Sequence, residues 1–152
     1  MPAAIGEVAP DFTLKDQNRQ DVRLSDFRGR RNVVLLFHPF AFSGICEGEL
    51  RALQAGIGSF VNDDVQLLAV SVDSFFAHRV WADREGFSFP LLSDFWPHGD
   101  VARAYGVFDE EKGCAVRATF VIDRQGVVRW SVVNPVPDAR DPADYLKALA
   151  EL

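Results

Sequence analysis

The residue most suited to chemistry in this chain is Cys46, within the segment Phe37-His38-Pro39-Phe40-Ala41-Phe42-Ser43-Gly44-Ile45-Cys46-Glu47. An apolar, strand-like run at 32–37 precedes this segment and a helical pattern follows it, so Cys46 is predicted at the start of a helix. Free backbone N–H groups and the positive end of the helix dipole favour a thiolate there, and the thiolate is the reactive form. Ser43 is expected to cap the same helix, and Pro39 restricts the path of the loop.

Each of these residues also has a structural interpretation. A lone helical cysteine is most often a small core residue, but such a residue would not need a helix start, a capping hydroxyl and a loop proline together. Arg117 opens an apolar strand and is either a solvated charge or a fixed positive charge beside the thiolate. Glu49 lies one turn after Cys46 and is either a surface acid or an ion-pair partner of Arg117. His38 is a candidate for the wall of the pocket.

The sequence lacks the motifs of other kinds of functional site. The three histidines are scattered and form no ligand pair with a cysteine, so no metal site is predicted. There is no Cys-x-x-Cys motif, no glycine-rich phosphate loop and no Cys/His protease signature. We therefore expect chemistry without a metal or other cofactor.

The spacing Pro39-x-x-x-Ser43-x-x-Cys46 resembles the peroxidatic-cysteine motif of the peroxiredoxins, with serine in place of the more usual threonine. Further similar segments follow in the family's order over nearly the whole chain, at 6–14, 26–29, 89–94 and 117–123. Within the family, the segments 93–99 and 104–108 are most similar to the AhpE-type one-cysteine peroxiredoxins of actinobacteria.

This resemblance implies a thiol peroxidase acting on hydrogen peroxide and organic hydroperoxides, with peroxynitrite as a further candidate. Cys46 would become a sulfenic acid, Arg117 would contact the substrate oxygens, Ser43 would hydrogen-bond the peroxide and Pro39 would shield the thiol. The expected reductant is an external thiol, either mycothiol with a mycoredoxin-type partner or a thioredoxin-like protein. Homodimers or larger rings are also implied.

The second cysteine, Cys114, stands three residues before Arg117. Peroxiredoxins with two redox cysteines carry the second one elsewhere, so Cys114 is interpreted as structural and the protein as a one-cysteine enzyme. Two other functions stay open. One is a peroxide sensor or thiol relay that uses Cys46. The other is a catalytically silent binding module.

Composition sets the remaining expectations. The 152 residues, 48% of them hydrophobic, suit a single domain over 1–152. The net charge of −6 and the lack of a basic run argue against nucleic-acid binding. The N-terminus does not resemble a signal peptide, no run has transmembrane length, and two cysteines do not make a disulfide scaffold. A cytoplasmic protein that does not bind membranes is expected.

Periodicity predicts the elements that position these residues. We expect a hairpin at 12–14 and 22–24, strands at 33–37, 65–72, 90–92, 118–123 and 127–133, and helices at 46–60, 75–84, 100–105 and 141–152. Segment 134–142 is expected to be a surface loop. The order predicts an α/β fold with a central mixed sheet flanked by helices. This matches the thioredoxin-like fold, with an N-terminal hairpin, that the resemblance implies.

Overall fold

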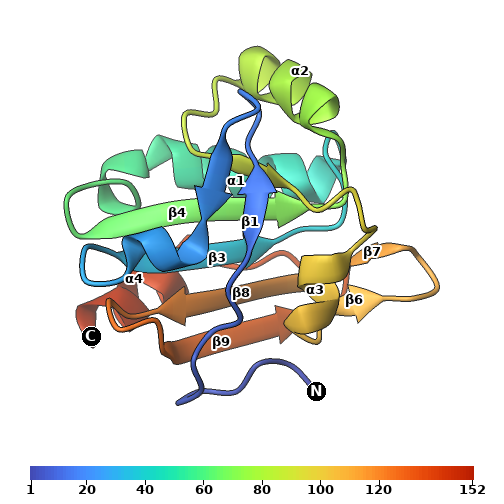
Figure 1. Cartoon of the computed structure of the whole chain (residues 1–152). Coiled ribbons are helices and arrows are strands. Elements are labelled where there is room, and N and C mark those ends of the chain that lie inside the picture. The colour runs from blue at the N-terminus through green and yellow to red at the C-terminus, as the bar shows by residue number, and fades with distance from the viewer.

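The computed structural model describes residues 1–152, and a seven-stranded mixed sheet lies at its centre (Figure 1). The strand order is β2-β1-β5-β4-β3-β8-β9. The strands are β1 (Thr13–Lys15), β2 (Asp21–Arg23), β3 (Asn32–Phe37), β4 (Val65–Ser71), β5 (Leu91–Ser93), β8 (Arg117–Ile122) and β9 (Val128–Asn134). β3, β4 and β5 are parallel, and the other pairs are antiparallel. A small separate sheet pairs β6 (Phe108–Asp109) with β7 (Cys114–Ala115).

Helices cover both faces of the sheet. The helices are α1 (Gly44–Ala55), α2 (Phe75–Glu85), α3 (Asp100–Ala104) and α4 (Pro142–Ala150), with short 3₁₀ turns η1 (Leu24–Phe27) and η2 (Ile57–Ser59). Core residues of α1, α2 and α4 pack on one face, and those of α3 pack on the other. The predicted α/β, thioredoxin-like architecture is therefore confirmed.

The central strand β3 is buried on both faces, which explains its unbroken apolar sequence. Successive side chains point to opposite faces, so Phe37 joins the core beneath α3 and Leu36 joins the core beneath α1. The chain leaves β3 at its carboxyl end and enters α1 within a few residues. This junction is where ligand sites commonly form in open α/β sheets.

The structure differs from the predicted elements at one helix boundary, one unpredicted strand pair and one loop. The first helix spans Gly44–Ala55, because Gly56 interrupts it and a 3₁₀ turn takes the chain on towards residue 60. The pair β6–β7 was not predicted, since two-residue strands carry no readable alternation. Segment 134–142 is only partly a surface loop, because Arg140 within it is buried. The helix predicted at 75–84 is observed as α2, which Ser74 caps by accepting from the Ala77 N–H and which ends at Gly86 in the left-handed conformation.

The longest helix, α1, has 12 residues, and no helix of the protein is long and apolar enough to cross a membrane.

Candidate active site at the start of helix α1

Cys46 lies in the first turn of α1, as its sequence position predicts. Its side chain is fully buried in the core beneath α1 and α2. The first-turn N–H groups of a helix have no partners within the helix, so they and the helix dipole favour negative charge at this position. The location suits a thiolate better than an ordinary core thiol.

Ser43 occupies the N-cap position, but its hydroxyl does not cap the helix. The Ser43 Oγ instead donates to the carbonyl oxygen of Phe40 at 3.0 Å, which closes a tight turn in the loop. The predicted capping hydrogen bond is therefore wrong, although the helix does begin directly after Ser43. Pro39 is buried near the start of the same loop. Both residues belong to the short connection between β3 and Cys46.

Strand pairing brings Arg117 to Cys46 across 71 residues of sequence. β8 runs antiparallel to β3, with Ala118 opposite Phe37, so the first residue of β8 lies at the carboxyl end of β3. The Arg117 Nη1 is 3.2 Å from the Cys46 Sγ, and its Nε donates to the carbonyl oxygen of Val136 at 2.5 Å. Arg117 is 2% exposed, so the solvated-charge interpretation does not hold.

Glu49 fixes the orientation of Arg117. Its Oε1 accepts from the Arg117 Nη1 at 2.6 Å, and its side chain is buried rather than on the surface. Of its two interpretations, the ion pair is therefore the one observed. Glu49 also binds a second guanidinium: the Arg140 Nε donates to Oε2 at 2.8 Å and the Arg140 Nη2 to Oε1 at 2.9 Å.

Arg140 is the site residue that the sequence reasoning missed. Its Nη1 also donates to the carbonyl oxygens of Phe37 and Ala118, at 2.7 and 2.8 Å, so it joins α1, β3 and β8. A single arginine in a loop rich in proline and aspartate carries no periodic signal. Only the tertiary structure shows that the loop folds back over the ends of the strands.

Charge counting explains why this cluster suits a thiolate. Burial acts to raise the pKa of Glu49, but the hydrogen bonds and charge of Arg140, and then the charge of Arg117, outweigh it and hold that pKa below its ordinary value. One carboxylate therefore faces two guanidinium groups, which leaves one positive charge uncompensated next to the sulfur. A thiolate at Cys46 would neutralise it.

His38 is fully buried, and neither ring nitrogen has a hydrogen-bond partner. Its ring lies 5.6 Å from that of Trp81, centroid to centroid, and no hydrogen bond joins it to Cys46. Burial lowers the pKa of His38 to about 4; Asp73 acts against this shift, and the charges of Arg140 and Arg117 add to it. The imidazole is therefore neutral at pH 7. The structure does not place it among the contacts of the thiol.

The buried histidines predict how stability depends on pH. The pKa of His78 is also lowered to about 4, by burial and by the nearby His38. Above pH 6.5 both residues are neutral in the folded and unfolded states and contribute no pH dependence. Below pH 6.5 only the unfolded chain readily takes up protons, so the free energy of unfolding falls as the pH drops towards 4, by roughly 3 kcal/mol per histidine.

Urea unfolding followed by tryptophan fluorescence between pH 7 and pH 4 would measure this loss. His38→Phe should unfold with a shallower pH dependence than the wild type, because one of the two buried titrating groups is gone. Equal slopes for wild type and His38→Phe would contradict the assignment.

Cys114 lies in β7, and both cysteines are free thiols. Burial, and then the charge of Asp109, raise the pKa of the Cys114 thiol. A thiol that resists ionisation is a poor nucleophile. This environment fits the structural role predicted for Cys114.

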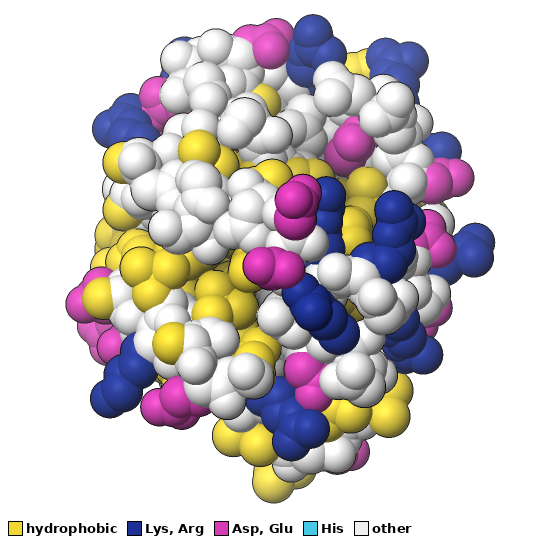
Figure 2. Space-filling model, turned by 90° about the vertical axis from the view of Figure 1, so that its left-hand side faces the viewer, with side chains coloured by type: hydrophobic (Ala, Val, Ile, Leu, Met, Phe, Trp, Pro, Cys, Tyr) yellow, Lys and Arg dark blue, Asp and Glu magenta, His cyan; other side chains and the backbone are white.

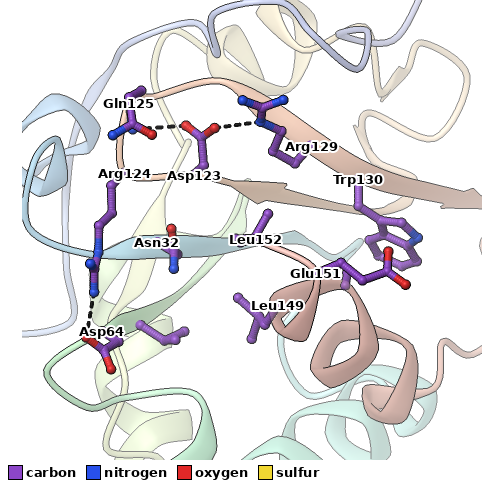
Figure 3. A pocket seen from close by; sticks show the side chains of 12 residues that line it. Asn32, Asp64, Asp123, Arg124, Gln125, Arg129, Trp130, Leu149, Glu151 and Leu152 are labelled. Atoms are coloured by element: carbon purple, nitrogen blue, oxygen red, sulfur yellow. Dashed lines mark hydrogen bonds and ion pairs between the residues drawn. The ribbon is translucent and has the colours of Figure 1, made fainter.

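A surface hollow of about 860 Å³ lies at the other end of the sheet (Figure 3). It is bordered by the start of β3, the turn between β8 and β9, and the end of α4. Both arginines of the hollow are paired within it: Arg124 with Asp64 at 2.5 Å, and Arg129 with Asp123 at 2.6 Å. Seen from this end, basic and acidic side chains are interspersed (Figure 2). This hollow therefore lies away from Cys46 and is not the candidate active site.

Fold and site together define a thioredoxin-like α/β protein with a buried thiol beside an arginine at a helix start. The model of the AhpC/TSA family matches residues 5–131. Alkyl hydroperoxide reductase E of Mycobacterium tuberculosis is 51% identical over 148 residues, covering 97% of each chain. A thioredoxin peroxidase of Echinococcus granulosus is 36% identical, over 98% of this chain and 81% of the other. Enterococcus faecalis AhpC superposes with a TM-score of 0.88 at 28% identity, over 98% of this chain and 92% of the other.

The chain therefore belongs to the AhpC/TSA family of peroxiredoxins and is a peroxidase. The similarity to AhpE-type members that the sequence predicts is confirmed by the 51% identity.

Proposed function

We propose that this protein reduces hydroperoxides through Cys46 and works with that cysteine alone. The observation that carries the proposal is the 3.2 Å contact between the Cys46 Sγ and the Arg117 Nη1, inside a buried cluster with one uncompensated positive charge. This cluster favours the thiolate in the resting enzyme. It also offers a hydrogen-bond donor to the oxygens of a bound peroxide.

In the proposed reaction the Cys46 thiolate attacks the terminal oxygen of the hydroperoxide. An S–O bond forms as the O–O bond breaks, the thiol is oxidised by two electrons to a sulfenic acid, and the alkoxide or hydroxide takes up a proton and leaves as alcohol or water. Arg117 stabilises the charge that moves onto the leaving oxygen. The Ser43 hydroxyl exchanges its contact with Phe40 for the peroxide, and Pro39 keeps bulk water from the sulfur.

Glu49 and Arg140 act through Arg117 rather than on the substrate. Glu49 accepts from both guanidinium groups, and Arg140 anchors it to the carbonyl oxygens at the ends of β3 and β8. His38 supplies a neutral wall behind the loop. These residues hold the donor in place before substrate arrives, which is the arrangement that electrostatic catalysis requires.

Organic hydroperoxides are proposed as substrates beside hydrogen peroxide, with peroxynitrite as a further candidate. The loop and first turn around Cys46 expose the apolar side chains of Phe40, Phe42 and Ile45, each about 40% accessible. Apolar surface at the entrance would retain an alkyl chain by burying it. This feature supports substrates larger than hydrogen peroxide.

A sulfenic acid must be reduced by two thiols from outside if Cys114 takes no part. The first thiol forms a mixed disulfide with Cys46 and releases water, and the second restores the Cys46 thiol. The resemblance to AhpE-type peroxiredoxins implies mycothiol with a mycoredoxin-like protein as the reductant, and the relative named thioredoxin peroxidase supports a thioredoxin-like protein. Two free thiols fit the reducing cytoplasm.

Self-association is also proposed, as a homodimer or a larger ring. β9 forms one outer edge of the sheet (Figure 1), and the N-terminal segment pairs with this edge only at its start, where Gly6 and Glu7 hydrogen-bond Val128. Val133 on this strand is 44% exposed. An unpaired edge with apolar side chains is a ready surface for a second copy of the chain.

One equivalent of peroxide, followed by intact-mass and peptide analysis, tests the one-cysteine chemistry. We expect a sulfenic acid on Cys46 that dimedone traps, and a sulfinic acid at the same residue when peroxide is in excess. Cys114→Ser should leave both the rate and the trapped product unchanged. A Cys46–Cys114 disulfide, within one chain or between two, would refute the one-cysteine mechanism and place Cys114 in it.

A further inference from the structure

The loop between β3 and α1 is held at its centre by a residue from the connection between β4 and α2. We propose that Asp73 is a positioning residue for peroxide attack, because its carboxylate holds the Ala41 N–H and thereby fixes the loop that carries Pro39 and Ser43. The inference rests on the proposed function of Cys46. Asp73 itself contacts neither the thiol nor Arg117.

Few hydrogen bonds hold the backbone of this loop to the rest of the protein. Between His38 and the start of α1, only the Ala41 N–H has an acceptor, the Asp73 Oδ2 at 2.8 Å. Phe42, the next residue, has a φ of +68°, in the left-handed region that residues other than glycine rarely adopt. Such a conformation persists only where the surroundings impose it.

Side chains of α2 hold Phe42 in this left-handed conformation. The Phe42 ring lies 5.9 Å from the Trp81 ring, centroid to centroid, and the Arg84 guanidinium lies 4.9 Å from the centre of the Phe42 ring. Asp73 holds the same conformation through its hydrogen bond to the backbone N–H of Ala41. Losing the Asp73 contact would leave the strained residue free to relax and to carry Ser43 with it.

Asp73 is itself fixed by a chain of hydrogen bonds that leads from the protein surface to the buried His78. The Ser71 Oγ donates to the Asp73 Oδ2 at 2.6 Å and lies 2.7 Å from the His78 Nε2. A hydroxyl has one proton, which goes to the carboxylate, so the His78 Nε2 carries the proton in the second bond. Ser93 donates to the Asp73 carbonyl oxygen at 2.7 Å. The chain links α2 and the ends of β4 and β5 to the loop after β3.

This geometry predicts an effect on peroxide attack that is separate from the reactivity of the thiol. The contacts of Arg117 with Cys46 and Glu49 do not involve Asp73, so the thiolate should survive the loss of Asp73. The positioning of the peroxide should not survive this loss, because displacing reacting groups by about 1 Å lowers the rate by up to about 100-fold. Alkylation by iodoacetamide needs the thiolate but not the positioned peroxide.

Stopped-flow oxidation by hydrogen peroxide and alkylation by iodoacetamide should therefore be measured on the same variants. For Asp73→Ala we expect the peroxide rate constant to fall between about 10- and 100-fold, with no matching fall in alkylation. Asp73→Asn keeps an oxygen acceptor for the Ala41 N–H and should restore most of the rate. Asp123→Ala is the matched control: Asp123 also accepts backbone N–H groups, from Gln125 and Val127, but at the far end of the sheet, so its loss should leave the peroxide rate unchanged.

An unchanged peroxide rate in Asp73→Ala, or an equal fall in both reactions, would overturn the inference while leaving the function of Cys46 intact. If Asp73→Ala does not fold, Ser71→Ala serves instead. It removes the hydroxyl that holds the carboxylate and should slow peroxide attack by a smaller factor, and an unchanged rate there would equally overturn the inference. Failure of the proposed function would appear in the wild type itself, as Cys46 left unoxidised by peroxide.

Discussion

Cys46→Ser should abolish peroxide reduction while the fold stays intact. A serine hydroxyl does not ionise near neutral pH and cannot form a sulfenic acid, so no slower version of the same reaction remains. The replacement is small and buried and breaks no helix or strand contact, so circular dichroism and urea unfolding should report a folded protein. The rate of peroxide consumption in the presence of a thiol reductant measures the effect. In Cys46→Ser this rate should fall to the rate measured without enzyme.

Cys114→Ser is the matched control for this variant. It makes the same change at the other buried cysteine, in β7, and should leave turnover at the wild-type level. Turnover retained in Cys46→Ser would contradict the proposed mechanism. Loss of turnover in both variants would show that Cys114 takes part.

Arg117→Ala should slow the attack of Cys46 on peroxide by about 100- to 1,000-fold, the usual effect of removing one donor that stabilises developing charge. The substitution removes the guanidinium that lies 3.2 Å from the sulfur. It also removes the uncompensated positive charge, because the remaining Arg140 and Glu49 neutralise each other. Stopped-flow tryptophan fluorescence at several pH values would measure the rate.

Arg117→Lys should restore only part of this rate. A lysine keeps the charge, but it is a point donor and cannot reach the Cys46 sulfur, the Glu49 carboxylate and the Val136 carbonyl with the fixed geometry of a guanidinium. Arg129→Ala is the control, since Arg129 is a paired arginine on the neighbouring strand β9. If Arg117→Ala reacts as fast as the wild type, Arg117 serves only to hold the loop around Val136.

The same cluster combines local and distant parts of the chain. Cys46 and Glu49 are one helical turn apart, a relation readable directly from the sequence. Arg117 arrives through strand order, because β8 pairs with β3 and so begins where β3 ends. Arg140 is brought to the cluster by the loop between β9 and α4.

Ser43 illustrates a different limit. Its position before the helix was readable, because serine favours N-caps and the helical pattern starts after it. Its hydrogen bond was not, because the hydroxyl can reach either a helix N–H or the Phe40 carbonyl, and the left-handed Phe42 brings that carbonyl within reach. A backbone conformation that is locally unfavourable is imposed by contacts, here with Asp73 and Trp81, and no local pattern announces it.

The sequence by itself determined the order and type of the main elements and the placement of a cysteine at a helix start after a strand. These follow from local chemistry: apolar periodicity, capping residues and the conformations that proline and glycine allow. Only the tertiary structure decided that Glu49 is buried between Arg117 and Arg140, that His38 stands apart from the thiol, and that Asp73 holds the loop. Each of these depends on contacts between residues distant in sequence, and a buried charge is stable only where the whole fold supplies its partners.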